Sequence, residues 1–404
     1  MDWNFLIKSD TDALSVTTDS RQITPGCVFV ALQGERFNGN RFAAQAIEQG
    51  AAYAIVDEDI ACTCSQQREY KGRIIRVESS LKALQDLARA WRRHWGKTII
   101  GITGTNGKTT TKELLAAVLS VKHNVHYTQG NFNNSLGVPL TLLQLTRNHD
   151  LAIVEMGASH PGDIKELVDI ADPDLGLITN VGRAHLEGFG SFEGVMQTKK
   201  ELYDYLRSKG RRIFLNEDNP YLTEMAEGMS YIGYRTGVMP DGMQLVGSYN
   251  AENVSAALCV GEHFGVSREE GLKAVRAYTP ANNRSQAMQT PNNRLIADAY
   301  NANPTSMQAA INAFTGDTYI LGAMRELGDY TRTEHQNIVN MLAERKAETV
   351  LLVGNEWHDT TTPYPVYDNV DALHRQLESE PLKGRHILLK GSHSVQLEKL
   401  LDVL

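Results

Sequence analysis

The sequence has no long apolar run, few cysteines and no excess of positive charge. Its 404 residues contain no stretch of about 18 apolar residues, which excludes a membrane-spanning helix. The four cysteines are too few and too scattered for a disulfide framework, and the spacing of Cys62 and Cys64 does not match the common zinc-binding pairs. A net charge of −8 argues against a non-specific nucleic-acid binder.

The beginning of the chain also lacks the basic region and long apolar region of a secretory signal. Together with the low cysteine content, this predicts a reduced, cytoplasmic protein that acts without a membrane or a nucleic acid. We further expect a monomer. The sequence shows neither internal repeats nor low-complexity segments.

The composition, with 42% hydrophobic and 22% charged residues, is that of a globular protein with a sizeable core. Apolar strand-like runs alternate with amphipathic helical segments, which predicts mostly parallel sheets covered by helices. We expect an α/β fold of three domains: a small α/β domain at 1–80, a central domain at 81–279 and a C-terminal Rossmann-like domain at 280–404.

One stretch, Gly101–Thr110, predicts a phosphate-binding loop. A β-branched run at Lys97–Ile100 comes before it, and good helix formers with apolar residues at helical spacing follow it at 108–120. A strand, a glycine-rich turn and a helix in this order form the setting in which such loops bind phosphate. Ile102 stands where the standard pattern has its first glycine. The alternative is a glycine-rich turn with a chance lysine.

Each residue type in this loop has a chemical reason to be there. Gly104 and Gly107 allow the backbone to curl so that N–H groups point inward, and the following helix contributes partial positive charge. Lys108 can reach terminal phosphates, and the Thr109 hydroxyl can bind Mg²⁺. The loop therefore predicts a nucleotide site.

Polar residues follow two further predicted strands of the central domain. Glu155 ends one strand, Asn180 lies near the end of the next, and His185 follows in the loop. Because ligands bind beyond the carboxyl ends of strands in open α/β sheets, we expect these residues to converge with Lys108. Glu155 is then a Mg²⁺ ligand or supports one, and the alternative is a satisfied surface charge.

Several candidates have two interpretations on local sequence alone. Ser20, Arg21 and the loop that reaches Asn40 fit a binding site or ordinary turn chemistry. Asn253 lies on the first turn of a predicted helix, where it can cap the helix or contact a base. Lys199 lies in a predicted helix over 193–206, where it can also belong to a solvated face.

Several motifs together resemble the Mur ligases and their folylpolyglutamate synthetase relatives, over nearly the whole chain. These motifs are Thr103–Thr109, Asn131–Pro139, Glu155–Gly157 and the loop from Asn180 to His185. Three further motifs resemble the branch that adds D-alanyl-D-alanine. They are Asp298–Pro304, Leu321–Gly328 with His335, and Lys390–Ser392.

The resemblance implies an ATP-dependent amide ligase of peptidoglycan precursor synthesis. It would join D-alanyl-D-alanine to UDP-N-acetylmuramoyl-tripeptide through an acyl phosphate, with Mg²⁺ as cofactor. The first domain would bind the UDP-sugar, the central domain ATP, and the third the dipeptide and part of the nucleotide. The alternatives are a sister ligase or folylpolyglutamate synthetase that adds one amino acid, or a nucleotide-binding module without catalysis. The Tyr300–Pro304 turn argues against the single-amino-acid ligases.

The resemblance also implies residue roles. The catalytic residues would be Lys108, Lys199 and His185. ATP would be bound by Gly104, Thr105, Asn106, Gly107, Lys108, Thr109, Thr110, Asn253, Arg284 and Asp298. Metal would be held by Thr109, Glu155, His185 and a carbamylated Lys199. The substrates would be bound by Ser20, Arg21, Asn40, Asn133, Asn134, Tyr300, Asn301, Asn303 and Lys390.

The chain departs from the family pattern at four places. Tyr249 precedes Asn250 where the family usually has His, and His393 stands where an Arg is usual. Lys200 follows Lys199 where a small residue is common. The stretch 219–247 is short, so we expect a small β-layer of the central domain to be missing.

Overall fold

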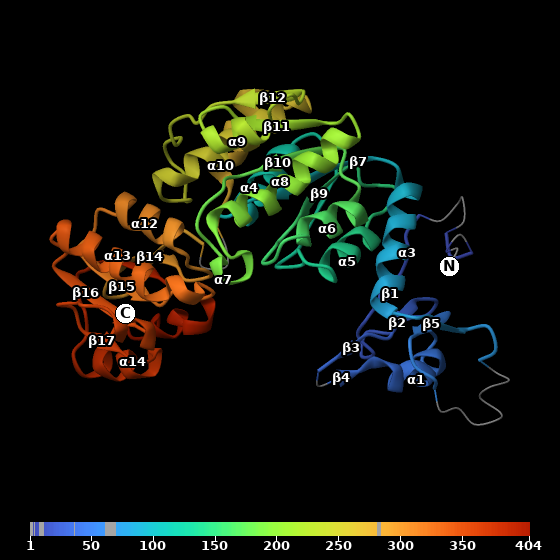
Figure 1. Cartoon of the computed structure of the whole chain (residues 1–404), viewed down its shortest axis with the longest axis horizontal. Helices are drawn as coiled ribbons and strands as arrows, with labels where there is room; N and C mark the ends of the chain where they lie inside the picture. Colours follow the sequence, from blue (N-terminus) through green and yellow to red (C-terminus); the bar gives the residue numbers. More distant parts are fainter. Residues whose placement is uncertain (1–2, 4, 8–11, 36, 61–69, 281–283) are drawn as a thin grey trace. The chain divides into compact units, whose positions relative to one another are not determined.

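The computed structural model describes residues 3, 5–7, 12–35, 37–60, 70–280 and 284–404. Its contacts group the chain into two compact units, one of residues 1–101, 123–157 and 163–176, the other of residues 102–122, 158–162 and 177–404 (Figure 1). The predicted α/β class is confirmed, and the boundaries at 80 and 280 stay predictions. Cys62 and Cys64 lie outside the described residues. Within the described part, no helix is long and apolar enough to cross a membrane.

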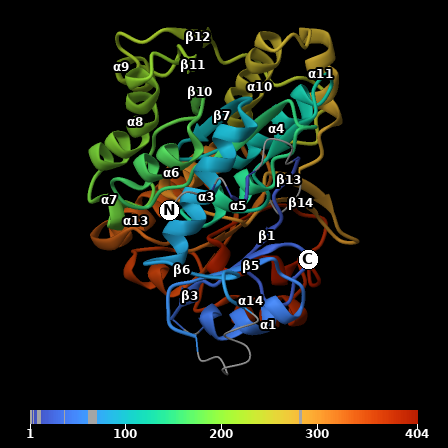
Figure 2. The ribbon, with the colours of Figure 1, turned by 90° about the vertical axis from the view of Figure 1, so that its right-hand side faces the viewer.

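The N-terminal sheet has the strand order β1-β2-β5-β6, and its paired strands run parallel. Helix α1 packs beside β5 through buried Ala43, Ala46 and Ile47 (Figure 2). The elements of this region are β1 (Val16–Thr17), β2 (Val28–Val30), β3 (Gln33–Gly34), β4 (Phe37–Asn38), η1 (Gly39–Phe42), α1 (Ala43–Glu48), β5 (Tyr53–Val56), β6 (Ile74–Arg76) and α3 (Ser80–Trp95).

Helix α3 is amphipathic, with Leu84, Leu87, Ala88 and Trp91 on its buried face. Ser79 caps its beginning by accepting a hydrogen bond from the Lys82 N–H, and Gly96 ends it in the left-handed conformation. Its apolar face packs on α5 and α6, and the Trp91 indole donates to the Leu145 carbonyl at 3.0 Å.

The central sheet has the strand order β12-β11-β10-β7-β9-β8. Strand β7 is buried after its first residue, as expected for an inner strand of a mostly parallel sheet, and it extends three residues beyond the predicted run, to Thr103. The short segment 219–247 still provides a helix and an edge strand, α9 and β12. The elements are β7 (Thr98–Thr103), α4 (Lys108–Leu119), β8 (Val125–Tyr127), α5 (Gly137–Leu143), β9 (Leu151–Glu155), α6 (Asp163–Ala171), β10 (Leu175–Ile178), α7 (Leu186–Phe189), α8 (Phe192–Ser208), β11 (Arg212–Asn216), α9 (Pro220–Met225), β12 (Tyr231–Tyr234), η2 (Ser248–Asn250), α10 (Ala251–His263) and α11 (Arg268–Ala277).

A histidine pair beside β8 makes stability depend on pH. The rings of His126 and His149 lie 5.0 Å apart, and His126 donates through Nε2 to the Thr141 carbonyl at 3.0 Å. Burial, followed by repulsion from His149, lowers the pKa of His126 from 6.5 to about 4. Because the unfolded chain keeps the ordinary pKa, it binds more protons below about pH 6.5 than the folded chain does.

We therefore expect the free energy of unfolding to fall as the pH decreases from about 6.5 toward 4. At pH 5 the loss from His126 is about 2 kcal/mol, because each pKa unit corresponds to about 1.4 kcal/mol. His126→Gln should flatten this dependence, since glutamine keeps a donor and does not titrate. Urea unfolding at pH 7.5 and pH 5.0 measures the slope. An unchanged slope in the variant would assign the effect to other groups.

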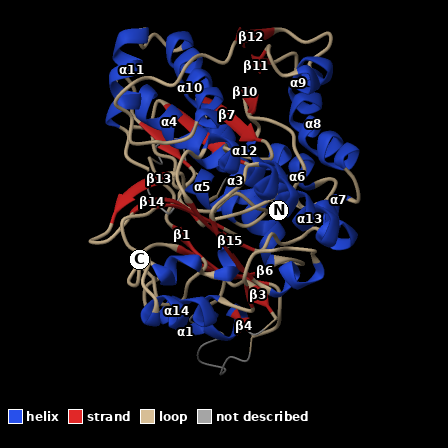
Figure 3. Ribbon diagram, turned by 90° about the vertical axis from the view of Figure 1, so that its left-hand side faces the viewer, coloured by secondary structure: helices blue, strands red, loops and turns tan. Residues whose placement is uncertain are grey.

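The C-terminal sheet has the strand order β13-β14-β18-β15-β16-β17. Its strands β13, β14 and β15 are labelled in Figure 3. Strands β13 and β14 are antiparallel, and the other paired strands are parallel. Right-handed connections place α12 and α13 on one face and α14 on the other (Figure 1). The elements are β13 (Gln286–Gln289), β14 (Arg294–Asp298), α12 (Pro304–Ala313), β15 (Thr318–Gly322), η3 (Gly328–Tyr330), α13 (Thr331–Glu344), β16 (Thr349–Val353), η4 (Asn355–Asp359), β17 (Val366–Tyr367), α14 (Val370–Ser379), β18 (His386–Lys390), η5 (His393–Val395) and η6 (Leu397–Leu400).

Candidate nucleotide and ligation site

Gly104 and Gly107 of the predicted phosphate loop occupy positions that other residues cannot fill without strain. Gly104 has φ of 145°, and a Cβ there would lie 2.0 Å from Thr179 Oγ1. Gly107 has φ of 77° and precedes α4, and a Cβ there would lie 2.5 Å from Asn253 Oδ1. The loop therefore requires glycine for conformation and for space.

Asn180 holds the loop rather than reaching beyond the sheet edge. Its carbonyl accepts from the Thr105 N–H at 2.9 Å, and its Oδ1 accepts from the Asn106 N–H at 3.0 Å. These two amides are thus engaged within the fold. The first turn of α4, whose N–H groups lack helical partners, is the remaining anion-binding element.

Lys108 lies over the loop that precedes it. Its Nζ donates to the carbonyls of Gly104 at 2.7 Å and Thr105 at 3.1 Å. The next two residues, Thr109 and Thr110, are buried at the start of α4. Lys108 is half-buried and is the first residue of α4, so its positive charge lies at the beginning of the helix.

Asn253 connects two helices and is only 5% exposed. Its Oδ1 accepts from the Thr111 hydroxyl of α4 at 3.0 Å, and its Nδ2 donates to Asn250 Oδ1 at 2.8 Å. The side chain therefore does not cap α10, whose N-cap is Asn250, and its contact with a nucleotide base stays a prediction. It supports the nucleotide loop from behind, because it lies against Gly107.

His185 precedes α7 in the left-handed conformation, with φ of 50°. Its Nδ1 forms an ion pair with Glu326, and this hydrogen bond lowers the pKa of the Glu326 carboxyl. Because Nδ1 is used in this way, Nε2 is the ring atom that can serve a metal or substrate. Sequence reasoning quoted Glu326 within the Leu321–Gly328 motif but missed its pairing with His185, which lies 141 residues earlier in the chain.

Lys199 is buried, with only 2% of the residue exposed, and its Nζ lies 5.4 Å from the centre of the Phe189 ring. The solvated-face interpretation is therefore wrong for Lys199. Its neighbour Lys200 fits that interpretation, because it remains partly exposed and pairs with Asp204 at 3.2 Å. Burial thus distinguishes the two adjacent lysines of α8.

Glu155 ends β9 and is 1% exposed, so it is not a surface charge. Asn133 donates from Nδ2 to Glu155 Oε1 at 2.8 Å. Asn134 has a different task, because its Oδ1 accepts from the Gly137 N–H at 2.8 Å and holds the start of α5. Of these two predicted substrate residues, one therefore orients a carboxylate and the other supports a helix.

In the N-terminal region, Arg21 is exposed and pairs with Asp19 at 2.8 Å. Hydrogen bonds from Arg21 lower the pKa of Asp19 to about 2. Asn40 is 3% exposed, and its side chain bonds the side chain and backbone of Asp57 at 2.8 and 3.1 Å. Arg21 and the neighbouring Ser20 are therefore accessible to a ligand, whereas Asn40 fixes the loop from inside.

The turn after β14 is anchored by a buried ion pair. Lys390 Nζ lies 2.6 Å from Asp298 Oδ2 and also donates to the Asn301 carbonyl at 3.3 Å. Lys390 is 2% exposed, and its positive charge is paired with the Asp298 carboxylate inside the fold. The ion pair between Asp298 and Lys390 therefore stabilises the conformation of the turn.

Two of the departures from the family pattern lie around this turn. Arg284 stacks on the Tyr300 ring, with 3.6 Å between the guanidinium carbon and the ring centre, and the exposed His393 ring stacks on Tyr300 at 5.9 Å. The Tyr249 hydroxyl lies 2.7 Å from Ser285 Oγ. Burial, and then the nearby Asp298 charge, raise the pKa of Tyr249.

His335 has a structural task. It is fully buried within α13, which begins at Thr331. Its Nε2 accepts from the Met324 N–H at 3.1 Å, and its Nδ1 donates to the Thr331 carbonyl at 2.7 Å. Burial lowers its pKa, so the neutral ring fixes the segment after β15.

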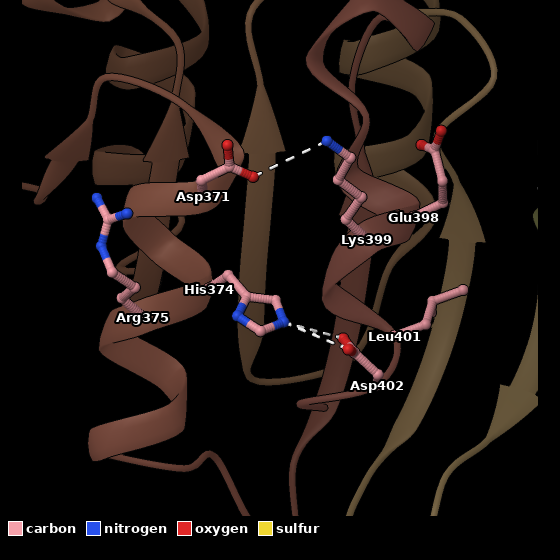
Figure 4. A pocket seen from close by; sticks show the side chains of 7 residues that line it. All are labelled: Asp371, His374, Arg375, Glu398, Lys399, Leu401 and Asp402. Atoms are coloured by element: carbon pink, nitrogen blue, oxygen red, sulfur yellow. Dashed lines mark hydrogen bonds and ion pairs between the residues drawn. The ribbon is translucent and has the colours of Figure 1, made fainter.

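A groove of about 530 Å³ lies between α14 and the C-terminal segment. Figure 4 shows His374 pointing toward Asp402 and Lys399 toward Asp371. None of the predicted site residues lines it. Its charges are largely paired within the groove, so it is separate from the candidate site.

Three family models match the chain. The model of the Mur ligase family catalytic domain matches residues 14–92, that of the Mur ligase middle domain matches 102–239, and that of the Mur ligase glutamate ligase domain matches 283–393. UDP-N-acetylmuramoyl-tripeptide–D-alanyl-D-alanine ligase of Bacillus subtilis (strain 168) is 32% identical, covering 95% of this chain and 92% of the relative. The chain belongs to the Mur ligase family.

Other members of the family are similar over comparable lengths. The ligase of the same name from Escherichia coli (strain K12) is 31% identical and covers 96% of this chain and 93% of the relative. The crystal structure of the MurF ligase from Thermotoga maritima in complex with ADP has a TM-score of 0.84 and 27% identity, covering 97% of both chains. MurF from Acinetobacter baumannii gives 0.84 and 28%, covering 97% of this chain and 93% of that one. The three-domain α/β architecture is thereby confirmed.

Proposed function

We propose that this Mur ligase joins D-alanyl-D-alanine to UDP-N-acetylmuramoyl-tripeptide at the expense of ATP. The observation that carries the proposal is similarity over nearly the full length to ligases of that name. A nucleotide loop like the one described here agrees with it, and a similar structure was determined with ADP. We further propose that the protein acts as a monomer in the cytoplasm, with the domain boundaries at 80 and 280.

The chemistry follows from the need to activate a carboxylate. The terminal phosphoryl group of ATP passes to the tripeptide's terminal carboxylate, which gives an acyl phosphate and ADP. The amine of the dipeptide then attacks the acyl carbon, and the tetrahedral intermediate loses phosphate to form the amide. Lys108 and the start of α4 bind the negative phosphate oxygens and stabilise charge during the transfer.

The donors of the chain fit Mg²⁺. Within the described residues there is no cluster of three or more His, Cys, Asp or Glu side chains suited to a metal. Mg²⁺ needs few protein ligands, because it usually takes one or two carboxylates together with substrate phosphates. We propose that the Thr109 hydroxyl holds one Mg²⁺ together with the ATP phosphates, and that Glu155, His185 and carbamylated Lys199 are metal ligands. When bound, the ion neutralises phosphate charge.

The substrate roles are proposed in two groups. Ser20 and the exposed Arg21 contact the UDP-sugar, and Asn40 holds their neighbouring loop. Arg284 and Tyr300 form the stacked surface that receives nucleotide and dipeptide.

Acceptor choice tests the proposal. We expect release of ADP to require both UDP-N-acetylmuramoyl-tripeptide and D-alanyl-D-alanine. The product should be heavier than the tripeptide substrate by two alanyl residues. D-alanine and L-amino acids should react far more slowly. Coupled measurement of ADP and mass spectrometry of the product decide this. Equal incorporation of a single amino acid would favour a sister ligase, and ADP release without either substrate would favour a different enzyme.

A further inference from the structure

The side chain of Asn303, predicted to bind substrate, is already used inside the fold. The residue is 6% exposed. Its Oδ1 accepts from the Ser306 N–H at 2.9 Å and thereby caps α12. Its Nδ2 donates to Asn106 Oδ1 in the nucleotide loop at 2.7 Å. Asn303 therefore connects the start of α12 to the nucleotide loop.

The side chain of Asn106 moves with the backbone of the nucleotide loop. The Asn106 backbone is bonded to the segment after β10, because the N–H donates to Asn180 Oδ1 and the carbonyl accepts from the Thr179 hydroxyl at 2.6 Å. Its side chain extends in the other direction, to Asn303. Any shift of the loop backbone therefore moves one partner of the amide pair.

A second contact joins the same two regions. The hydroxyl of Thr305, the second residue of α12, accepts from the Arg183 N–H at 2.9 Å. The preceding residue, Gly182, approaches so closely that a Cβ would lie 2.8 Å from Thr305 Oγ1, and its N–H donates to Thr105 Oγ1 at 2.9 Å. All of these residues belong to one compact unit.

The turn between Asp298 and Asn303 is thus held at both ends. At its beginning, Asp298 pairs with Lys390 of the neighbouring strand β18. At its end, Asn303 bonds the nucleotide loop. The first anchor belongs to the C-terminal sheet alone, whereas the second depends on the position of Asn106.

We propose that Asn106 and Asn303 are positioning residues. They couple the nucleotide loop to the turn between Asp298 and Asn303, where the dipeptide binds. A nucleotide bound at the loop fixes Asn106, the amide pair holds Asn303, and the turn gains affinity for the dipeptide. Linkage requires the dipeptide to strengthen nucleotide binding by the same factor. This inference rests on the proposed function, whose own test is dipeptide-dependent ligation by the unaltered protein.

The test uses Asn303→Ser. Serine still caps a helix but is too short to reach Asn106. We expect the KM for D-alanyl-D-alanine to rise about five- to tenfold, with kcat changed less than about twofold, in line with the loss of one coupling contact. The tightening of dipeptide binding by ADP should also disappear. The matched control is Asn312→Ser, an exposed asparagine of the same helix, which should behave as wild type.

Asn106→Ala leaves the cap of α12 intact and should produce the same loss of coupling. In the double variant the increase in KM should equal that of the stronger single variant, because both changes break one contact. Additive increases would overturn the proposal. Equal loss of dipeptide affinity with and without ADP would also overturn it, because Asn303 would then contact the dipeptide itself. Failure of the wild type to ligate the dipeptide would instead refute the proposed function.

Discussion

Lys108→Ala should reduce ligation by at least about 10³-fold while the protein stays folded. The magnitude follows from the loss of a preorganised positive group that stabilises the phosphoryl transfer. The ammonium donates to the carbonyls of Gly104 and Thr105, which water can satisfy in the variant. Substitutions at such half-exposed positions usually change stability little. Steady-state ADP release and thermal unfolding measure the two effects.

The control for this change is Lys122→Ala. Lys122 is exposed soon after the end of α4, where it donates to the Gly265 carbonyl at 2.8 Å and pairs with Glu270 at 2.9 Å. The Lys122→Ala variant loses a positive charge and the contacts that the lysine makes, as the Lys108→Ala variant does. Its ligation activity should remain within about twofold of that of the wild type. Near-normal turnover in Lys108→Ala would refute the nucleotide role of the loop.

Sequence patterns located the elements that carry strong local signals. The β-branched runs around Ile99 and Ile153 lie in strands β7 and β9, and the apolar spacing from Leu84 to Trp91 lies in α3. Short edge strands such as β13 and β17 were missed. They have only four and two residues, which is too short to show a hydrophobic period, and each is defined by its pairing with a neighbouring strand, as Gln286 pairs with Ala297.

The same distinction holds for the candidate site. The glycines and Lys108 of the phosphate loop were found because their chemistry depends on adjacent residues. The partners that determine what the other polar residues do are distant, as Glu326 is from His185 and Asn303 is from Asn106. Local sequence therefore identified polar residues near the site without showing which of them are used within the fold.

Lys199→Ala should lose about 10² to 10³ in ligation rate, as expected for removal of a group that supports the transferring phosphate. An ammonium beside Mg²⁺ would be repelled by the ion. When the neutral amine attacks CO₂, a nitrogen–carbon bond forms and one proton leaves, so the side chain ends in an anionic carbamate that suits a hard cation. Burial of Lys199, which keeps water from the group, is consistent with this chemistry.

Chemical rescue and a matched neighbour make the role of Lys199 testable. Added short carboxylates such as acetate should restore part of the activity of Lys199→Ala by supplying the missing anion, whereas they should leave wild type and Lys108→Ala unchanged. Lys200→Ala removes a partly exposed lysine that pairs with Asp204 and should remain active. Carbon-13 NMR with labelled bicarbonate should show a carbamate signal in wild type and Lys200→Ala but not in Lys199→Ala. Full activity of Lys199→Ala without any carboxylate would refute the carbamate, since no other buried lysine of α8 is present in the described helix to replace it.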